Sequence, residues 1–459
     1  MQLPDNLLAN LKNIPGFDRQ AFIDIHNSEE KITSFRLNPH KTKNITSAEI
    51  FEGIEMRAIP WSIDAFYLST RPSFTLDPLF HAGAYYVQEA SSMFLEQALR
   101  QSIDLGRNLN VLDACAAPGG KSTHIQSLIS AESILVSNEV IKSRVSVLAE
   151  NITKWGADNV VVTNNDTRDF NRLPEYFDVI VVDAPCSGSG LFRKDPNAIK
   201  EWGLEQVGIC SRRQQSILQD LIPSLKPGGI LIYSTCSYSA EEDEAISDFL
   251  VQMENLISLP LQVNPEWKIV TSYSPGTESP GYRFYPDKLE GEGFYLSVFQ
   301  KPGELKKNDH NNGRPKFKLL SAAEKVITGK FILLPPPMVL FHFEKSVIAI
   351  SYDLFEELTL ISRSLYIRQA GIEMGNIIRN EFIPHHALAL SKFVSPEVYR
   401  IELNREDALE YLRRNIFFPL SEDTGWVLVS YKEIALGWIK VLPGRINNYY
   451  PKSWRILHK

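Results

Sequence analysis

Cysteine is scarce in this sequence, with four residues among 459. That number excludes a disulfide-stabilised scaffold and is typical of proteins that work in a reducing compartment. Long hydrophobic runs are also missing. The most apolar stretch, Phe331–Phe343, carries three prolines and is too short and too broken to span a bilayer. The opening residues show no basic segment followed by an apolar one, so no secretory signal is visible. We therefore expect a cytoplasmic protein that makes no membrane contact.

An excess of positive charge is lacking as well. The formal net charge is −7, which taken alone argues against a nucleic-acid partner. The charge is unevenly distributed, however, because residues 301–459 carry 23 Lys and Arg against 17 Asp and Glu, whereas residues 1–300 carry 25 against 38. This asymmetry predicts that the first part handles small molecules and that the C-terminal part contacts an anion. The last twenty residues, from Lys440 onwards, contain five basic residues and no acidic one.

The pattern of residues 108–300 predicts the fold class. Short β-branched runs alternate there with helical stretches, which favours a doubly wound, mostly parallel α/β sheet. The helices are expected to begin near Lys121, Ile141, Leu204 and Ala240. The expected strands are Asn110–Ala114, Ile134–Asn138, Val160–Thr163, Phe177–Asp183, Ile230–Ser234 and Phe294–Phe299.

The chain is long enough for about three domains at about 150 residues per domain, and its hydrophobic content of 44% supports a sizeable core. Residues 302–315 are polar and rich in turn formers, so we interpret them as a linker. The expected division is an N-terminal region at 1–75, an α/β domain at 76–301, the linker at 302–315, a middle extension at 316–380 and an α+β domain at 381–459.

The first expected strand leads into the sequence DACAAPGGK at residues 113–121. A carboxylate, a loop of small residues and the start of a helix follow one another, so backbone amides can approach a ligand closely. One interpretation is a phosphate-binding P-loop, because GKS at 120–122 matches the end of that motif. Against it, Cys115 stands where the first glycine belongs, and Pro118 removes an amide. We prefer a nucleotide-like cofactor site; a plain glycine turn is the alternative without function.

Two acidic residues follow the next expected strands. Glu139 comes 19 positions after Gly120, where an acidic residue bonds ribose hydroxyls in doubly wound sheets. Asp166 follows the third strand and could accept a hydrogen bond from an adenine amino group. Either residue could instead only cap a helix or a turn.

Two cysteines occupy matching positions after two further strands. DAPCSG at 183–188 follows the fourth strand, and YSTCSY at 233–238 follows the fifth. If strands one, four and five are neighbours, Cys186 and Cys236 meet the cofactor loop in one crevice, since adjacent strands lie about 4.8 Å apart. We interpret Cys210, and the side chain of Cys115, as structural.

A thiolate, a carboxylic acid and a nucleotide-like cofactor together suit methylation of cytosine. Carbon 5 of cytosine is a poor nucleophile until a thiolate adds at carbon 6. Asp183 is expected to donate or share a proton at N3, where charge develops. After methyl transfer a base must remove the proton on carbon 5, and a second thiol could serve. The chemistry alone leaves open which of Cys186 and Cys236 attacks.

These motifs resemble those of the Nop/Sun family of RNA cytosine-C5 methyltransferases, and the likeness also covers SerThrCysSer at 234–237 and Arg144 behind Glu139. The resemblance implies a Rossmann-like domain that uses S-adenosyl-L-methionine. It also implies that Cys236 is the nucleophile and that Cys186 assists product release. The implied catalytic residues are Cys236, Cys186, Asp183 and Lys121, and the implied cofactor-binding residues are Cys115, Ala116, Ala117, Pro118, Gly119, Gly120, Lys121, Glu139, Asp166 and Asp183.

The flanking regions extend the resemblance over nearly the whole chain. RLN at 36–38 and AYYVQEASSM at 84–93 look like the family's RNA-binding N-terminal region and its junction with the catalytic domain. The C-terminal part is similar to the bacterial RsmF branch, where a middle extension precedes a PUA-like RNA-binding domain. One departure is Asp287, since related sequences read Arg-x-x-Pro-His where this chain has RFYPD at 283–287.

The C-terminal tail, RINNYYPKSWR at 445–455, has basic residues interleaved with Tyr449, Tyr450 and Trp454. This composition suits phosphate contact and base stacking, although an ordinary amphipathic strand would look similar. The RsmF-like features imply 16S rRNA or the small ribosomal subunit as the partner. We further expect a monomer and no resident metal. The alternatives are a tRNA methyltransferase, a P-loop nucleotide hydrolase, and a non-catalytic ribosome-assembly protein.

Overall fold

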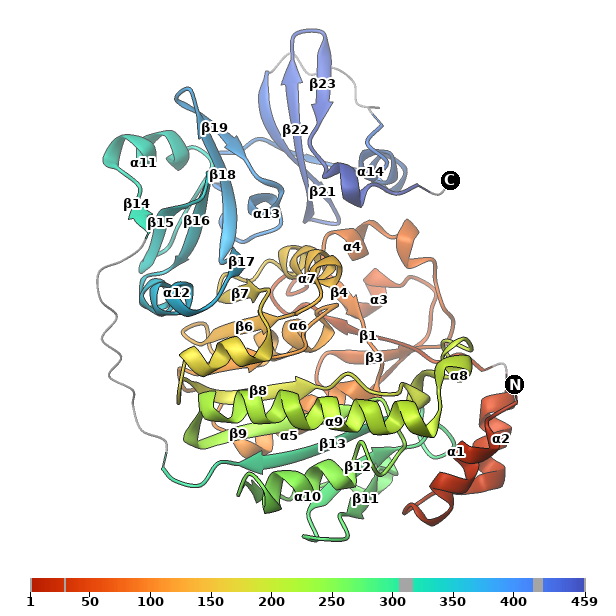
Figure 1. The fold of residues 1–459 in the computed structure, drawn as a ribbon. Coiled ribbons are helices and arrows are strands. Elements are labelled where there is room, and N and C mark those ends of the chain that lie inside the picture. Colours follow the sequence, from red (N-terminus) through yellow and green to blue (C-terminus); the bar gives the residue numbers. More distant parts are fainter. Residues whose placement is uncertain (1, 29, 305–316, 416–423, 458–459) are drawn as a thin grey trace.

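The computed structural model describes residues 2–28, 30–304, 317–415 and 424–457. A ten-stranded sheet forms the centre of the molecule (Figure 1). Nine of its strands follow the order β11-β12-β13-β9-β8-β5-β6-β7-β17, and the tenth, β10, pairs with β13. The strands are β5 (Asn110–Asp113), β6 (Ile134–Asn138), β7 (Val160–Thr163), β8 (Phe177–Asp183), β9 (Leu225–Thr235), β10 (Ile257–Ser258), β11 (Val270–Tyr273), β12 (Pro280–Phe284), β13 (Phe294–Gln300) and β17 (Ile367–Ala370).

The strands β9, β8, β5, β6 and β7 run parallel, and β13 adds to β9 in the antiparallel direction. This is the expected doubly wound sheet, and all six expected strands are present. Their β-branched and aliphatic side chains are buried on both faces, as a parallel sheet covered by helices requires.

Helices cover the two faces of the central sheet in two sets. One set packs against Val111, Leu135 and Val179, and the other packs against Leu112 and Ile180. The first set is α5 (Leu95–Ser102), α6 (Gly120–Leu128) and α7 (Lys142–Trp155); the second is α9 (Leu204–Leu221), α10 (Glu244–Gln252) and α12 (Tyr352–Ser364). The short helix α8 (Ala198–Glu201) precedes α9.

Gly156 ends α7 in a left-handed conformation with φ 80°, which favours glycine over other residues. A Cβ there would also lie 2.6 Å from the carbonyl oxygen of Leu390. The turn after α7 therefore needs glycine for two reasons, and it lies against Leu390 from the C-terminal half of the chain.

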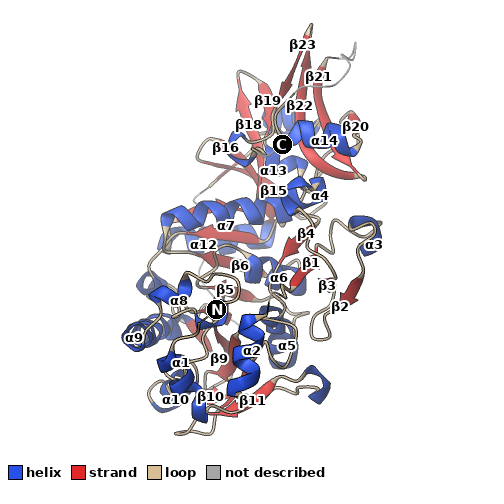
Figure 2. Cartoon of the chain, turned by 90° about the vertical axis from the view of Figure 1, so that its right-hand side faces the viewer, coloured by secondary structure: helices blue, strands red, loops and turns tan. Residues whose placement is uncertain are grey.

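A second, four-stranded antiparallel sheet forms the N-terminal region, in the order β2-β3-β1-β4. Helices α1 and α2 precede it and lie next to α10 and β11 (Figure 2). They pack against Tyr238, two residues after Cys236. The elements are α1 (Asp5–Asn10), α2 (Arg19–Asn27), β1 (Thr33–Leu37), α3 (Ser47–Ile50), β2 (Met56–Ala58), β3 (Ala65–Leu68), α4 (Pro78–His81) and β4 (Tyr85–Val87).

The segment after the linker is partly built into the central sheet. Strand β17 pairs with β7, and α12 covers the adjacent face. The remaining strands form a five-stranded sheet in the order β14-β15-β16-β18-β19. The elements are β14 (Lys318–Leu319), α11 (Ala322–Gly329), β15 (Met338–Phe343), β16 (Ser346–Ser351), β18 (Ile372–Ile378), β19 (Glu381–Pro384) and α13 (His386–Ala389).

The last unit is a four-stranded sheet in the order β20-β21-β22-β23. Its apolar face shares one core with the N-terminal sheet, because Phe35 and Tyr85 belong to the same cluster as Tyr411, Val429 and Tyr450. The N-terminal sheet is therefore packed against the last unit, which lies above the central sheet (Figure 1). The elements are β20 (Arg400–Glu402), α14 (Arg405–Leu412), β21 (Gly425–Tyr431), β22 (Ile434–Leu442) and β23 (Arg445–Asn448).

The expected segments and the observed elements do not coincide everywhere. Strand β4 lies within the expected catalytic segment 76–301 but belongs to the N-terminal sheet. The expected boundary at residue 380 divides one hairpin, because β19 begins at Glu381 and pairs with β18. Residues 305–315 of the expected linker lie outside the described residues.

Candidate active site

The carboxyl ends of β5, β8 and β9 lie side by side in the sheet, as predicted for strands one, four and five. The side chains at these ends are Asp113, Asp183 and Thr235. Three loops follow, and they carry the cofactor motif and the two cysteine motifs. Since ligands of doubly wound sheets bind at such a crevice, this edge is the candidate active site.

The two cysteine loops bring their thiols into contact. The sulfur atoms of Cys186 and Cys236 lie 2.9 Å apart, and both cysteines are free and half-buried. The hydrogen bond to Cys236, together with burial, raises the pKa of the Cys186 thiol well above its usual value. The predicted meeting of these two side chains in one crevice is thus present in the structure.

A cavity of about 640 Å³ opens in front of these thiols. The two cysteines and residues of the cofactor motif line the same cavity. It is large enough for a nucleoside-sized ligand, since small-molecule pockets start at about 300 Å³. The lining residues that the sequence had singled out are Cys115, Ala117, Glu139, Asp166, Asp183, Cys186 and Cys236.

The cofactor loop follows β5 and leads into α6. Gly119 precedes the helix with φ 114°, a conformation that L side chains rarely adopt. The loop lines the large cavity on one side and a second cavity of about 200 Å³ on the other, and Asp183 borders both. Of the predicted loop residues, Ala116, Pro118, Gly120 and Lys121 line the second cavity, while Cys115 and Ala117 line both. Burial raises the pKa of the Cys115 thiol, which is consistent with a structural side chain.

Glu139 and Asp166 line the large cavity and also act as local caps. Glu139 accepts a hydrogen bond from the backbone N–H of Ile141 at 2.9 Å and pairs with Arg144 at 3.2 Å. Asp166 accepts from the backbone N–H of Arg168, and its hydrogen bonds to the Arg168 side chain lower the pKa of its carboxyl. Both carboxylates thus present fixed acceptors to a ligand with hydroxyl or amino groups.

Asp183 and Lys121 form an ion pair at the rim of both cavities. The Lys121 ammonium lies 2.7 Å from Oδ2 of Asp183, and only 12% of the lysine side chain is exposed. Ser234 donates a hydrogen bond to the other oxygen of Asp183 at 2.9 Å. Burial opposes the charge on Lys121, but Asp183 and Asp113 outweigh it and raise the pKa of the lysine. The site therefore holds a charged, oriented pair.

Asp113 is marked by the sequence only as the carboxylate that ends the first strand. It is fully buried and accepts a hydrogen bond from the Ser122 hydroxyl at 2.6 Å. Burial raises the pKa of its carboxyl to about 7. Its other oxygen has no hydrogen-bond partner among the described residues. A buried carboxylate directly beneath the loop links β5 to the first turn of α6 and so stiffens the cofactor motif.

The N-terminal region supports the cofactor loop from the other side, a role that sequence patterns did not predict. Arg36 of β1 is buried and donates hydrogen bonds to the carbonyl of Gly120 and to Thr123 Oγ1. It also approaches Gln88 Oε1 at 3.4 Å. Tyr86 and Gln88 line the smaller cavity. Residues of β4 and of the segment after it therefore belong to the site. The sequence signal for the role of Arg36 was the presence of an arginine in an apolar strand.

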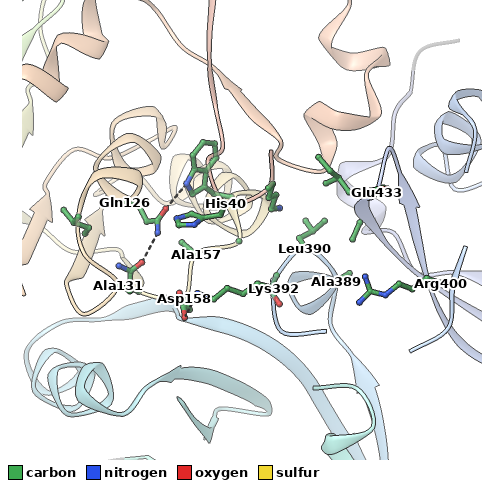
Figure 3. Close-up of a pocket in the computed structure, with 18 residues that line it drawn as sticks. His40, Gln126, Ala131, Ala157, Asp158, Ala389, Leu390, Lys392, Arg400 and Glu433 are labelled. Atoms are coloured by element: carbon green, nitrogen blue, oxygen red, sulfur yellow. Dashed lines mark hydrogen bonds and ion pairs between the residues drawn. The ribbon is translucent and has the colours of Figure 1, made fainter. Parts of the chain in front are cut away.

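A further cavity of about 240 Å³ lies elsewhere (Figure 3). It is lined by His40 of the N-terminal region, Asp158 before β7, and Lys392 and Arg400 from the C-terminal half. Because Asp158 precedes β7, this cavity opens at the amino edge of the parallel strands. It is thus at the edge opposite the cysteines.

The C-terminal tail differs from expectation at one residue. Tyr450 is fully buried and packs against His386 and Tyr411, so its predicted base-stacking role is wrong. Tyr449 is 38% exposed and lies against Trp426. Both tyrosines follow β23, which ends at Asn448, and the chain there turns one of the two rings into the core.

Membrane spans and metal clusters are both missing from the described part of the chain. No helix among these residues is long and apolar enough to cross a membrane. Within the same ranges, no group of three or more His, Cys, Asp or Glu side chains is placed to hold a metal ion.

Solved structures share this architecture. A methyltransferase homologue from Pyrococcus horikoshii is 26% identical, with a TM-score of 0.51 over 65% of this chain and 100% of its own. NSun6 from the same organism, solved with SFG, an analogue of S-adenosylmethionine, shares the fold at 20% identity, with a TM-score of 0.54 over 66% of this chain and 99% of its own. The fold and the cavity define a Rossmann-like, S-adenosylmethionine-dependent methyltransferase.

Family models cover the chain in three parts. Residues 3–90 match the N-terminal domain of 16S rRNA methyltransferase RsmF, residues 101–300 match 16S rRNA methyltransferase RsmB/F, and residues 398–456 match the methyltransferase RsmF PUA domain. Ribosomal RNA small subunit methyltransferase F of Aeromonas salmonicida is 31% identical over 87% of this chain and 86% of its own. The enzyme of that name from Shewanella loihica is 28% identical over 92% and 88%. The chain belongs to the RsmB/F family of methyltransferases.

Proposed function

We propose that this chain transfers a methyl group to carbon 5 of a cytosine in 16S rRNA. Its family and its relatives named ribosomal RNA small subunit methyltransferase F support rRNA as the substrate. The observation that carries cytosine as the target is the contact between Cys186 and Cys236 at the cofactor cavity. Activation of a pyrimidine carbon by thiol addition needs one sulfur, and release of the product uses a second.

The residues around the large cavity suit S-adenosylmethionine. Carboxylates at Glu139 and Asp166 can accept from ribose hydroxyls and the adenine amino group, while Cys115, Ala117 and Asp183 line the same cavity. When bound, the cofactor supplies an electrophilic methyl group. The protein residues that line the cavity would hold it against the strand ends.

We assign the nucleophile to Cys236. Its thiolate forms a bond to carbon 6 of cytosine, the double-bond electrons move towards carbon 5 and the N3 end of the ring, and carbon 5 becomes able to take a methyl group. The proton that Cys236 releases on becoming a thiolate passes to Asp183, which lines the same cavity and is held by Lys121 and Ser234. Asp183 shares this proton with N3 and so stabilises the developing charge. The fixed geometry of this pair removes the need to reorganise during the reaction.

We assign product release to Cys186. Its thiol is the donor in the hydrogen bond to Cys236, because its pKa is raised. After Cys236 has bonded to carbon 6, its sulfur is neutral and no longer accepts this hydrogen bond, so two causes of the raised pKa of Cys186 are removed. Cys186 then gives its own proton to solvent and, as a thiolate, accepts the proton from carbon 5. The carbon 5–carbon 6 double bond then re-forms, the sulfur–carbon 6 bond breaks, and Cys236 leaves as a thiolate.

We propose that the N-terminal region (1–75) and the PUA-like domain (381–459) bind RNA next to a catalytic domain at 76–301, with the middle extension at 316–380 joining them. The core that the two end regions share makes them one rigid surface. We further propose that the enzyme acts in the cytoplasm, because its rRNA substrate is made in that compartment. We also propose that it acts as a monomer.

Bisulfite sequencing of 16S rRNA tests the proposal. RNA from a strain that lacks the protein should lose one protected cytosine, and the intact gene should restore it, whereas a Cys236→Ala copy should not. Bisulfite sequencing of tRNA from the same strains tests the alternative substrate. Unchanged 16S rRNA would refute the proposal, and disappearance of a tRNA signal would replace it with the tRNA assignment.

A further inference from the structure

A buried carboxylate connects the two cysteine loops. Each cysteine is followed by a serine, and the hydroxyls of Ser187 and Ser237 both donate to Oε2 of Glu242, at 2.5 and 2.6 Å. The backbone N–H of Ser187 donates to Oε1 at 2.8 Å, and Gln214 of α9 donates to the same oxygen at 3.3 Å. One side chain thus accepts four hydrogen bonds, three of them from residues adjacent to the cysteines.

The position of Glu242 is itself well fixed. It lies in the turn between β9 and α10 and is completely buried. The next residue, Asp243, accepts a hydrogen bond from Thr235 at 2.7 Å and pairs with Arg283. Thr235 and Ser237 flank Cys236, so both neighbours of this cysteine are held by consecutive acidic residues of one turn.

We propose that Glu242 is a positioning residue that fixes the loops of Cys186 and Cys236 against each other so that the two sulfur atoms stay in contact. This inference rests on the proposed function for its catalytic meaning. The geometry behind it does not, because it consists of the hydrogen bonds by which Glu242 links Ser187 to Ser237. The direct contact between those two hydroxyls is longer, at 3.4 Å.

The charge of Glu242 adds a second effect. After the hydrogen bond to Cys236 and burial, the charge of Glu242 is among the causes that raise the pKa of the Cys186 thiol. A negative charge close to Cys186 keeps the shared proton on that sulfur. The same carboxylate therefore links the two cysteine loops and favours the protonated form of Cys186.

The first experiment measures the geometry without catalysis. Diamide, a two-electron oxidant, joins two adjacent thiols as a disulfide, with both thiol hydrogens passing to the reagent, and mass spectrometry of peptides detects the Cys186–Cys236 pair. In full-length protein we expect Glu242→Ala to slow formation of this disulfide at least tenfold. The control Glu241→Ala, an exposed residue of the same turn, should react like the unchanged protein. Equal rates in Glu242→Ala and the unchanged protein would overturn the proposal.

The second experiment measures methyl transfer to 16S rRNA. Displacement of a reacting atom by about 1 Å costs on the order of a hundredfold in rate, so Glu242→Ala should lower kcat by roughly tenfold to a hundredfold and leave KM for S-adenosylmethionine unchanged. Glu242→Gln should restore most of kcat, because its carbonyl can accept from Ser187 N–H while the two hydroxyls turn to accept from its amide. Equal loss in both variants, or a change confined to KM, would contradict a positioning role.

A second variant, Ser187→Ala/Ser237→Ala, tests the proposal if the Glu242→Ala protein does not fold. This double variant should reproduce the slow disulfide formation, and fast formation would overturn the proposal. If the unchanged protein forms the disulfide in a Glu242-dependent way but does not methylate RNA, the proposed function fails and the positioning of the thiols stands.

Discussion

The sulfur atoms of Cys186 and Cys236 lie 2.9 Å apart, although 50 residues separate them in the chain. Each sits in the loop after one of two adjacent parallel strands, β8 and β9. The sheet therefore brings the two thiols together and aligns them beside the cofactor cavity. The distance between two side chains is decided here by strand order.

Replacement of Cys236 and replacement of Cys186 should block methyl transfer at different steps. Cys236→Ala should abolish methyl transfer, because no bond to carbon 6 forms. Cys186→Ala should instead accumulate a covalent protein–RNA adduct, because attack proceeds but release stalls. Denaturing gel electrophoresis of reactions with labelled 16S rRNA distinguishes the two outcomes. An adduct with Cys236→Ala and none with Cys186→Ala would exchange the assigned roles.

The basic tail should contribute a salt-dependent part of RNA affinity. We expect neutralisation of four side chains to reduce the slope of log K against log salt by about 0.7 for each phosphate of single-stranded RNA that they pair with in the unchanged protein. Filter binding over a range of salt concentrations measures the slope. The four side chains are Lys440, Arg445, Lys452 and Arg455.

The matched control for the tail removes the same charge from exposed positions of the middle extension. An equal change of slope in both variants would assign the effect to net charge and contradict a specific role of the tail. The control positions are Lys325, Lys330, Lys345 and Arg379.

Replacement of Tyr450 and replacement of Tyr449 should have different effects on the free energy of unfolding. Tyr450→Ala removes a fully buried aromatic ring and should lower the free energy of unfolding by about 3–5 kcal/mol, as for other large buried aromatic side chains. Tyr449→Ala removes a ring that is 38% exposed and should cost much less. Urea denaturation measures both. A loss for Tyr449→Ala as large as that for Tyr450→Ala would contradict the observed packing.

Asp113 should make stability depend on pH. Burial raises the pKa of its carboxyl from 3.8 to about 7, so the folded state binds this proton more tightly than the unfolded state. Its contribution to the free energy of unfolding is fully present below pH 3.8 and declines as the pH rises towards 7. Asp113→Asn keeps an acceptor for Ser122 and cannot ionise.

The difference in unfolding free energy between Asp113→Asn and the unchanged protein should therefore increase from about pH 4 to about pH 7. Denaturant titrations at several pH values measure this difference. A difference that stays constant across the range would show that the carboxyl of Asp113 is not perturbed by its burial.

Local sequence patterns revealed much of the catalytic domain. The β-branched runs located all six expected strands, and the motif at 113–121 located the turn into α6. The cysteine motifs could be assigned to one crevice because parallel strands of known order place their carboxyl ends together. These features depend on residues that are near one another in the chain, or on one rule of sheet topology.

The features that the sequence did not reveal depend on contacts between distant residues. Arg36 supports the cofactor loop from another sheet, and β17 joins the central sheet from beyond the linker. Glu242 is one of four consecutive acidic residues at 241–244, and nothing in that pattern distinguishes it. The composition of the tail also predicted the same role for Tyr449 and Tyr450. The sequence by itself determined the strands, the motifs and the family chemistry, since these follow from local periodicity and residue type. Only the tertiary structure decided which side chains are buried and which loops are joined, because burial and hydrogen bonding are settled by packing across the whole chain.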